Sequence, residues 1–422
     1  MANTFAAPEA SPALAGYTTS MALRKLRVLL VGGPMYDPLY ARLPEFERQT
    51  GRAVEVAGAL PHPALNARIA EEFGGKTAAF DLISTHTKYA PSQRQWLTPL
   101  DDDLGPDEVA AFHPRTLSLA RIEGALYGVP RNLDVKLLYY RTDLFADAGE
   151  RREFKTRAGA DLRVPNTWDE LRAIALHFAR TPVLHGFAFP GRESGLFGHF
   201  FELLAASGGR LLTDRGEPAV DGEAGRWALG LLVDLYRRGA APPETPDWHY
   251  DEVAACFREG RAAMTTDWPG GFYTYNDSAM SSVRDVFDLA LYPSGPRGRY
   301  IYAGSHTFAI PVTARDRPAA LELLRFLTSE ESQLVEARRG SLPTRPAVLS
   351  RVRAESSPGS MAARRWTLLE QSVDAALFPP AVARWPEVEE AIWQCARAAI
   401  VGEMSVSRAL AEMAARMRPA VG

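Results

Sequence analysis

The sequence is poor in cysteine and contains no long apolar run. Only Cys256 and Cys395 occur among its 422 residues, without a Cys-x-x-Cys spacing or a Cys/His cluster, so no structural zinc site is expected. Two isolated cysteines this far apart are expected to be buried free thiols. No apolar stretch approaches the roughly 20 residues that a membrane-spanning helix needs.

The sequence also lacks an excess of charge of either sign. The chain has 48 Lys and Arg against 51 Asp and Glu, a net charge of −3, whereas nucleic-acid binders usually carry a basic excess. Its apolar fraction of 46% excludes disorder of the whole chain. The length is sufficient for about two or three domains with a substantial core.

Familiar catalytic and cofactor motifs are absent as well. There is no phosphate-binding loop of the form G-x-x-x-x-G-K-[ST], no H-E-x-x-H and no calcium loop. Gly191–Gly195 has serine as its fourth residue, whereas a nucleophile elbow needs it third. The turn at Val31–Pro34 lacks the third glycine of a dinucleotide loop, and Pro34 removes a donor N–H. We therefore expect neither catalysis nor a cofactor nor a bound metal.

The N-terminal segment does not read as a secretory leader. Residues 1–20 contain no Lys or Arg, and the apolar stretch after Arg24 and Lys25 is shorter than the ~7–15 residues that a leader needs. The segment predicts a disordered tail over 1–23, followed by a buried strand over Leu26–Val31.

Strand-like and helical stretches alternate along the first hundred residues. We expect strands over 26–31, 53–57 and 80–84 and helices over 40–47 and 66–73. This alternation is typical of a parallel α/β sheet, in which ligands bind beyond the carboxyl ends of the strands. The loops 34–37 and 85–89 then lie at one edge, which makes Tyr36, Thr85 and His86 candidate binding residues.

Two further segments predict helix starts. Thr167 is followed three residues later by Glu170, and Thr328 by Glu331, the spacing of a capping box. Other helices are expected over 197–207, 226–239, 251–260, 388–400 and 405–417, and other strands over 262–265, 287–291 and 307–312.

The order of short motifs resembles one known family. The motifs are Tyr127-Gly-Val-Pro130, Leu138-Tyr-Tyr140, Pro165–Leu171, Phe257–Met264 followed by Trp268, Gly304-Ser-His306 and Gly340–Pro343. Together they resemble the ABC-transporter solute-binding proteins of extracellular family 1, which are maltose-binding-protein-like. The resemblance covers residues 26–417.

The resemblance implies a periplasmic-binding-protein-like α/β fold of type II, with two discontinuous α/β lobes and a ligand cleft between them. One lobe is expected to comprise 24–135 plus 306–350, and the other 136–305 plus 351–422. The chain is expected to cross between them near 134–138 and 303–308, with a third passage around Ser350.

The implied function is that of the substrate-binding component of an ABC importer, which captures a carbohydrate or polyol and delivers it to the transmembrane subunits of a permease. A monomer without nucleic-acid partners is expected. The family implies the periplasm, although the sequence shows neither a leader nor a lipid-attachment cysteine, so a cytoplasmic location stays open. Two alternatives remain: a binder of an anionic solute, such as a phosphorylated polyol or sugar acid, or a cytoplasmic α/β enzyme or sensor.

Carbohydrate sites combine an aromatic face with polar groups that bond hydroxyls. Trp268, in a Pro-Gly-Gly loop after a strand, is either a stacking platform or a core or hinge filler. Arg131, Asn132 and Asp134 are either a cleft constellation or a hinge network, and Gly304 and Ser305 are expected to offer backbone donors. For the anionic alternative, Arg131, Arg192 and Arg345 would converge on the ligand. The candidate ligand-binding residues are thus Tyr36, Thr85, His86, Arg131, Asn132, Asp134, Arg192, Trp268, Gly304, Ser305 and Arg345.

Overall fold

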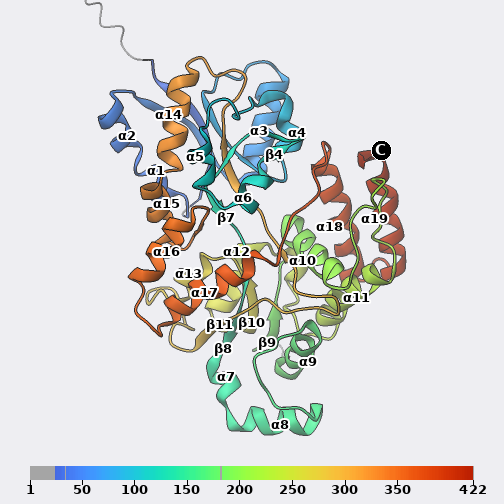
Figure 1. Ribbon diagram of the computed structural model, residues 1–422. Coiled ribbons are helices and arrows are strands. Elements are labelled where there is room, and N and C mark those ends of the chain that lie inside the picture. Colours follow the sequence, from blue (N-terminus) through green and yellow to red (C-terminus); the bar gives the residue numbers. More distant parts are fainter. Residues whose placement is uncertain (1–23, 34, 181–182, 422) are drawn as a thin grey trace, which may run out of the picture.

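The computed structural model describes residues 24–33, 35–180 and 183–421 (Figure 1). The tail predicted for 1–23 lies outside these residues. Two mixed sheets, each covered by helices, form the upper and lower parts of the molecule in Figure 1. No helix in the described ranges is both long and apolar enough to cross a membrane.

The first sheet has the order β2-β1-β3-β13-β6. Its strands are β1 (Leu26–Val31), β2 (Val54–Leu60), β3 (Leu82–His86), β6 (Val129–Pro130) and β13 (His306–Ala309). β1 runs parallel to β2 and β3, which confirms the expected parallel start, whereas β13 is antiparallel to β3 and β6. The surrounding helices are α1 (Asp37–Tyr40), α2 (Leu43–Thr50), α3 (His62–Gly74), α4 (Ala90–Gln93), α5 (Pro106–Ala110), α6 (Pro114–Leu119) and α14 (Arg317–Leu327).

The second sheet has the order β11-β8-β10-β9. Its strands are β8 (Leu137–Arg141), β9 (His185–Ala188), β10 (Ala262–Asp267) and β11 (Phe287–Ala290). β10 is parallel to β9 and antiparallel to β8. The helices of this part are α7 (Thr142–Ala146), α8 (Ala148–Ala158), α9 (Trp168–Phe178), α10 (Glu193–Ala206), α11 (Glu223–Arg237), α12 (Tyr250–Arg258), α13 (Gly271–Tyr275), α17 (Met361–Val373), α18 (Trp385–Val401) and α19 (Val406–Val421).

The chain passes from the first sheet to the second between Pro130 and Leu137 and returns between Ala290 and His306. The two crossing segments touch at an antiparallel bridge between Asp134 and Gly304. Short strands flank this junction: β7 (Asn132–Leu133) pairs with β14 (Leu342–Pro343), and β12 (Ile301–Tyr302) pairs with β15 (Ala376–Leu377). The hairpin of β4 (Arg121–Ile122) and β5 (Ala125–Leu126) and the helices α15 (Glu330–Ala337) and α16 (Pro346–Glu355) complete the fold.

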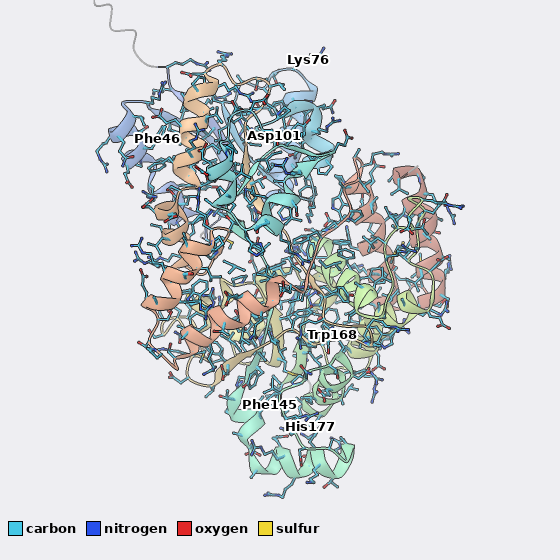
Figure 2. The ribbon with its side chains drawn as sticks, viewed as in Figure 1. Phe46, Lys76, Asp101, Phe145, Trp168 and His177 are labelled. Atoms are coloured by element: carbon cyan, nitrogen blue, oxygen red, sulfur yellow. The ribbon has the colours of Figure 1, made fainter. Side chains whose placement is uncertain are left out.

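The hydrophobic core is divided between the two sheets. Phe46 packs in a cluster with β1, whereas Trp168 and Phe145 belong to a larger cluster around β8 and β10 (Figure 2). Leu334 and Val348 pack in that larger cluster, although the expected division assigns 306–350 to the first lobe. The division into lobes therefore remains a proposal. Cys256 and Cys395 are buried and not paired with each other.

Two helix starts test the capping predictions. Thr167 accepts a bond from the N–H of Glu170 at 3.2 Å, and the Glu170 carboxylate accepts the N–H of Thr167 at 3.2 Å, which confirms the first capping box. The second prediction is wrong by one residue. Ser329 caps α15, because the hydroxyl of Thr328 instead donates to Leu324 O at 2.9 Å, satisfying a carbonyl at the end of α14.

Candidate functional site

Polar side chains gather where strands of the first sheet end. Tyr36 follows β1, His62 follows β2 as the first residue of α3, and His86 is the last residue of β3. The antiparallel strand β13 begins at the same edge and places His306 opposite His86. The carboxyl ends of parallel strands share one edge of a sheet, so residues far apart in sequence meet here.

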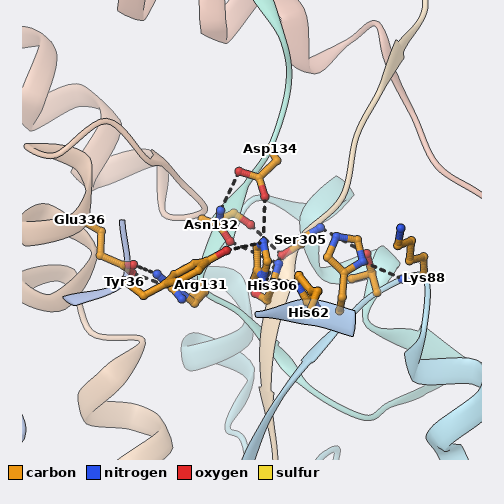
Figure 3. Close-up of polar contacts among 11 residues, drawn as sticks. Tyr36, His62, Lys88, Arg131, Asn132, Asp134, Ser305, His306 and Glu336 are labelled. Atoms are coloured by element: carbon orange, nitrogen blue, oxygen red, sulfur yellow. Dashed lines mark hydrogen bonds and ion pairs between the residues drawn. The ribbon is translucent and has the colours of Figure 1, made fainter. Parts of the chain in front are cut away.

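Three imidazole rings lie in mutual contact at this edge (Figure 3). His62 Nε2 lies 2.9 Å from His306 Nδ1, and the two rings stack with centroids 4.6 Å apart. The ring of His86 meets His62 at 5.3 Å and His306 at 5.2 Å, both edge to face. His306 Nε2 in turn lies 3.2 Å from Tyr36 Oη and 3.3 Å from Asp134 Oδ2.

The surroundings keep two of these rings uncharged. Burial lowers the pKa of His62 well below its ordinary value, and the neighbouring His306 and Lys88 act in the same direction. Burial likewise lowers the pKa of His86, to which His306 and His62 add. Both side chains are therefore neutral near pH 7 and retain one donor and one acceptor nitrogen each.

An ion pair joins this edge to the other half of the molecule. Lys88 Nζ lies 2.6 Å from Glu389 Oε1, and the Tyr89 hydroxyl donates to Glu389 Oε2 at 2.9 Å. Burial alone would lower the pKa of Lys88, but the Glu389 carboxylate, together with Tyr302 and Tyr89, raises that pKa well above its ordinary value. Glu389 lies on α18, which packs on α10 and α19, so the contact spans the two halves.

Trp268 lies on the opposite side, in the loop after β10, and is partly buried. Its indole meets the ring of Tyr250 at 5.3 Å and that of Tyr302 at 6.1 Å. Lys136 Nζ lies 5.4 Å from the indole centroid, and its own partner is the fully buried carboxylate of Glu202 at 2.8 Å. This arrangement fixes the orientation of the indole.

Several predicted residues are bonded within the protein. Thr85 is buried and donates to Gln93 Oε1 at 2.5 Å. The N–H of Gly304 donates to Asp134 O at 3.3 Å and that of Ser305 to Thr87 Oγ1 at 3.2 Å. The backbone donors expected at Gly304 and Ser305 are therefore engaged within the protein, the first between the crossing segments and the second with the loop after β3.

Asn132 connects the two crossing segments. Its amide donates to Asp134 Oδ1 at 2.8 Å, and its Oδ1 accepts the N–H of His306 at 3.2 Å. The hydroxyl of Ser305 donates to Asn132 O at 2.7 Å. Asn132 thus belongs to a hinge network, whereas Asp134 faces both this network and His306.

The three candidate arginines do not converge. Arg131 is buried in an ion pair with Glu336 and covers the ring of Tyr36 at 4.5 Å. Arg345 donates to Thr328 O at 2.8 Å and lies over the ring of Phe112. Arg192 pairs with Glu193 at 3.0 Å and Glu252 at 3.7 Å. The convergence expected for the anionic alternative is therefore not found, because each guanidinium is engaged at a different place.

Sequence reasoning missed His62, Lys88, His306 and Glu389. His62 follows the second strand directly, so the rule that selected Tyr36 and His86 would also have found it. Lys88 lies in the loop already selected, and His306 in a motif already noted. Nothing in the sequence singles out Glu389, which lies 301 residues from Lys88.

Two cavities lie outside the histidine cluster. One, of about 680 Å³, is lined by residues 164–166, β11 and α17. The other, of about 530 Å³, is lined by α4, Arg94, Tyr127 and the segment before α18. Within the described ranges, no group of three or more His, Cys, Asp or Glu side chains has a geometry that could hold a metal ion.

Comparison with known proteins identifies a family and several relatives. The model of the bacterial extracellular solute-binding protein family matches residues 32–334. A mannitol-binding protein of Pseudomonas aeruginosa is 27% identical over 297 residues, which span 67% of this chain and 64% of that relative.

Solved structures extend the likeness to nearly the whole chain. The maltose-bound MalE3 protein of T. maritima superimposes with a TM-score of 0.81 at 26% identity, covering 93% of this chain and 99% of that one. A ribitol complex of an ABC-transporter solute-binding protein from Agrobacterium radiobacter gives a TM-score of 0.80 at 20% identity, covering 94% and 98%. These likenesses confirm the expected two-lobe α/β fold of type II.

Proposed function

Because the chain belongs to the bacterial extracellular solute-binding proteins, we propose that it captures a carbohydrate or polyol between two hinged lobes and delivers it to the permease of an ABC importer. The observation that carries this proposal is a cluster of polar side chains at one edge of the first sheet, together with an aromatic side chain in the other half of the molecule. The polar cluster contains His62, His86 and Asp134, and the aromatic side chain is Trp268.

Closure is a hinge motion about the crossing segments. We assign 24–135 with 306–350 to one lobe and 136–305 with 351–422 to the other. Asn132 holds the two segments together on one side of the Asp134–Gly304 bridge, and Glu202 does so on the other. A solute that contacts both lobes stabilises the closed state by its differential affinity.

The chemistry of the site favours a neutral polyhydroxylated solute. Aromatic faces stack on the apolar faces of sugars, and neutral imidazoles bond hydroxyl groups. An anionic solute is disfavoured, because Asp134 and Glu389 lie at the edge and the guanidinium of Arg131 already pairs with Glu336. The names of two relatives, which mention mannitol and maltose, point to the same chemical class.

The family is extracellular, and the periplasm is our proposal for this chain. The partners would be the transmembrane subunits of a permease, and the working form would be a monomer.

The experiment is a thermal-shift and calorimetric screen with maltose, D-mannitol, ribitol and tagatose, with gluconate and mannitol 1-phosphate as anionic controls. A ligand at a hundredfold excess over Kd stabilises the native state by about 2.7 kcal/mol, which raises the Tm by a few degrees. Saturable binding of a neutral compound supports the proposal. A response to the anionic controls alone, or to none of the six compounds, contradicts it.

A further inference from the structure

The protonation pattern of the histidine cluster follows from its contacts, beginning at Asp134. Both carboxylate oxygens face donors: Asn132 Nδ2 donates to Oδ1 at 2.8 Å, and His306 Nε2 lies 3.3 Å from Oδ2. A carboxylate only accepts, so a neutral His306 carries its proton on Nε2. The opposite tautomer would place two lone pairs against each other. In the neutral ring of this tautomer, Nδ1 of His306 is an acceptor.

The tautomer of His62 follows by the same matching of donors to acceptors. Because His306 Nδ1 accepts, the His62 Nε2 atom at 2.9 Å carries the proton and donates it. The remaining nitrogen of the neutral ring, His62 Nδ1, is an acceptor. It is buried and has no hydrogen-bond partner among the residues that the structure describes. Buried polar atoms in proteins are nearly always bonded, so this acceptor lacks the donor that its site calls for.

His86 has the complementary property. The N–H of Lys88 donates to His86 Nδ1 at 3.2 Å, so the neutral ring carries its proton on Nε2. Gly304 packs against this side of the ring, where an added Cβ would lie 2.4 Å from both Nε2 and Cε1. In the described part of the chain no hydrogen-bond acceptor faces this donor.

A donor and an acceptor therefore lie on adjacent rings, edge to face with centroids 5.3 Å apart. We propose that His62 and His86 recognise hydroxyl groups of the bound solute, His62 Nδ1 accepting and His86 Nε2 donating, with Asp134 and His306 as positioning residues that fix the tautomer of His62. Hydroxyls both donate and accept, whereas a carboxylate or phosphate only accepts and an ammonium only donates. This assignment rests on the proposed function.

Nuclear magnetic resonance of the unliganded, ¹⁵N-histidine-labelled protein tests the tautomers directly. Long-range ¹H–¹⁵N correlations distinguish the two tautomers of each neutral ring. We expect the proton on Nε2 in His62, His86 and His306. A proton on Nδ1 of His62 or His86 overturns the proposal, whatever the protein binds.

Two variants of His62 distinguish its bond to the solute from its bond to His306. His62→Gln places an amide at the position of Nε2, retaining a donor to His306 but losing the acceptor. His62→Asn places its oxygen at the position of Nδ1, retaining the acceptor but losing the link to His306. Using D-mannitol, ribitol or maltose as the probe in calorimetry, we expect Kd to rise about tenfold in His62→Gln and to change less than about threefold in His62→Asn. The reverse order overturns the proposal.

His113 offers a matched control, because its Nδ1 is also buried without a partner among the described residues but lies at the start of α6. His113→Gln should leave Kd unchanged, and melting curves of all variants report whether they fold. A wild-type protein that binds none of the three probes contradicts the proposed function. Intact binding with a wrong tautomer or a reversed variant order contradicts only the assignment of His62 and His86.

Discussion

Lys88 Nζ lies 2.6 Å from Glu389 Oε1, and the two side chains come from opposite halves of the molecule. Both are nearly inaccessible, with exposed side-chain fractions of 6% and 9%. Because Tyr89 also donates to Glu389, one carboxylate on α18 holds two residues of the loop after β3. This contact joins the two halves next to the edge that contains the histidines.

We therefore predict that Lys88→Met opens the molecule. An unpaired buried carboxylate costs about 3–5 kcal/mol, and separation of the halves relieves that cost by hydrating Glu389. Small-angle X-ray scattering should show a larger radius of gyration, and calorimetry about a tenfold higher Kd for the solute. Arg157→Met, which breaks the exposed pair with Glu153, is the control and should change neither. A Lys88→Met protein with unchanged dimensions and affinity would contradict the prediction.

Replacing Trp268 tests whether its indole is a stacking platform. Its partly buried ring packs on Tyr250 and Tyr302, and an aromatic contact contributes about 0.5–1.5 kcal/mol beyond the area it buries. We expect Trp268→Ala to raise Kd at least tenfold while the Tm falls by only a few degrees. Trp168→Ala, at a fully buried position, should instead lower stability by about 3–5 kcal/mol. If Trp268→Ala lowered the Tm as much as Trp168→Ala and left Kd unchanged, Trp268 would be a core residue.

The buried pair of Lys136 and Glu202 gives a prediction about the hinge. Glu202 also accepts the N–H of Tyr302 at 2.7 Å and the hydroxyl of Tyr292 at 2.5 Å, so it connects both crossing segments to α10. Lys136→Met leaves an unpaired buried charge and should lower the free energy of unfolding by about 3–5 kcal/mol in urea denaturation.

The double variant Lys136→Met/Glu202→Gln provides the control. It removes the unpaired charge while the amide oxygen of Gln continues to accept from Tyr302, so part of the lost stability should return. A double variant no more stable than Lys136→Met would show that packing, and not the isolated carboxylate, accounts for the loss.

The sequence predicts local features of this molecule better than its long-range contacts. Leu26–Val31 and the capping box at Thr167 follow from patterns within a few residues, and both are found. The ion pair of Lys88 with Glu389 could not be predicted, because its partners are 301 residues apart and each alone resembles an ordinary surface charge.

The arginines illustrate the same limit. A surface guanidinium, a buried ion pair and an anion-binding group have the same sequence pattern. Arg131 pairs with Glu336, 205 residues away, and only the packing of α15 against the first crossing segment decides this. His62 differs, because the strand-end rule suffices to find it, whereas its tautomer depends on Asp134 and His306.

His199 should make stability depend on pH. It is fully buried, with Nδ1 3.2 Å from Gly195 O and Nε2 3.2 Å from Thr266 Oγ1, and burial together with Lys136 lowers its pKa well below the ordinary value of about 6.5. Below that pH the unfolded chain binds a proton that the native state does not, so acid destabilises the native state by up to about 1.4 kcal/mol per pH unit.

The comparison with His199→Gln isolates this residue from other titrating groups. The advantage of the wild type over the variant in urea denaturation should be constant above about pH 7 and should shrink as the pH falls from 6.5 to 5. An advantage that stays constant down to pH 5 would contradict a neutral buried His199.

Replacing Gly304 tests whether solute binding depends on the position of the His86 ring. A Cβ at this position would lie 2.4 Å from both Cε1 and Nε2 of the His86 ring, which is held by the N–H of Lys88 and cannot retreat without losing that bond. Gly304→Ala should therefore displace the imidazole and raise Kd about tenfold. Gly230→Ala is the control: within α11 nothing described lies within 4 Å of the added methyl group, and the change should stabilise the helix by about 0.5–1 kcal/mol. A Gly304→Ala protein that binds its solute as tightly as the wild type, with the His86 resonances unmoved, would show that this ring has room to adapt.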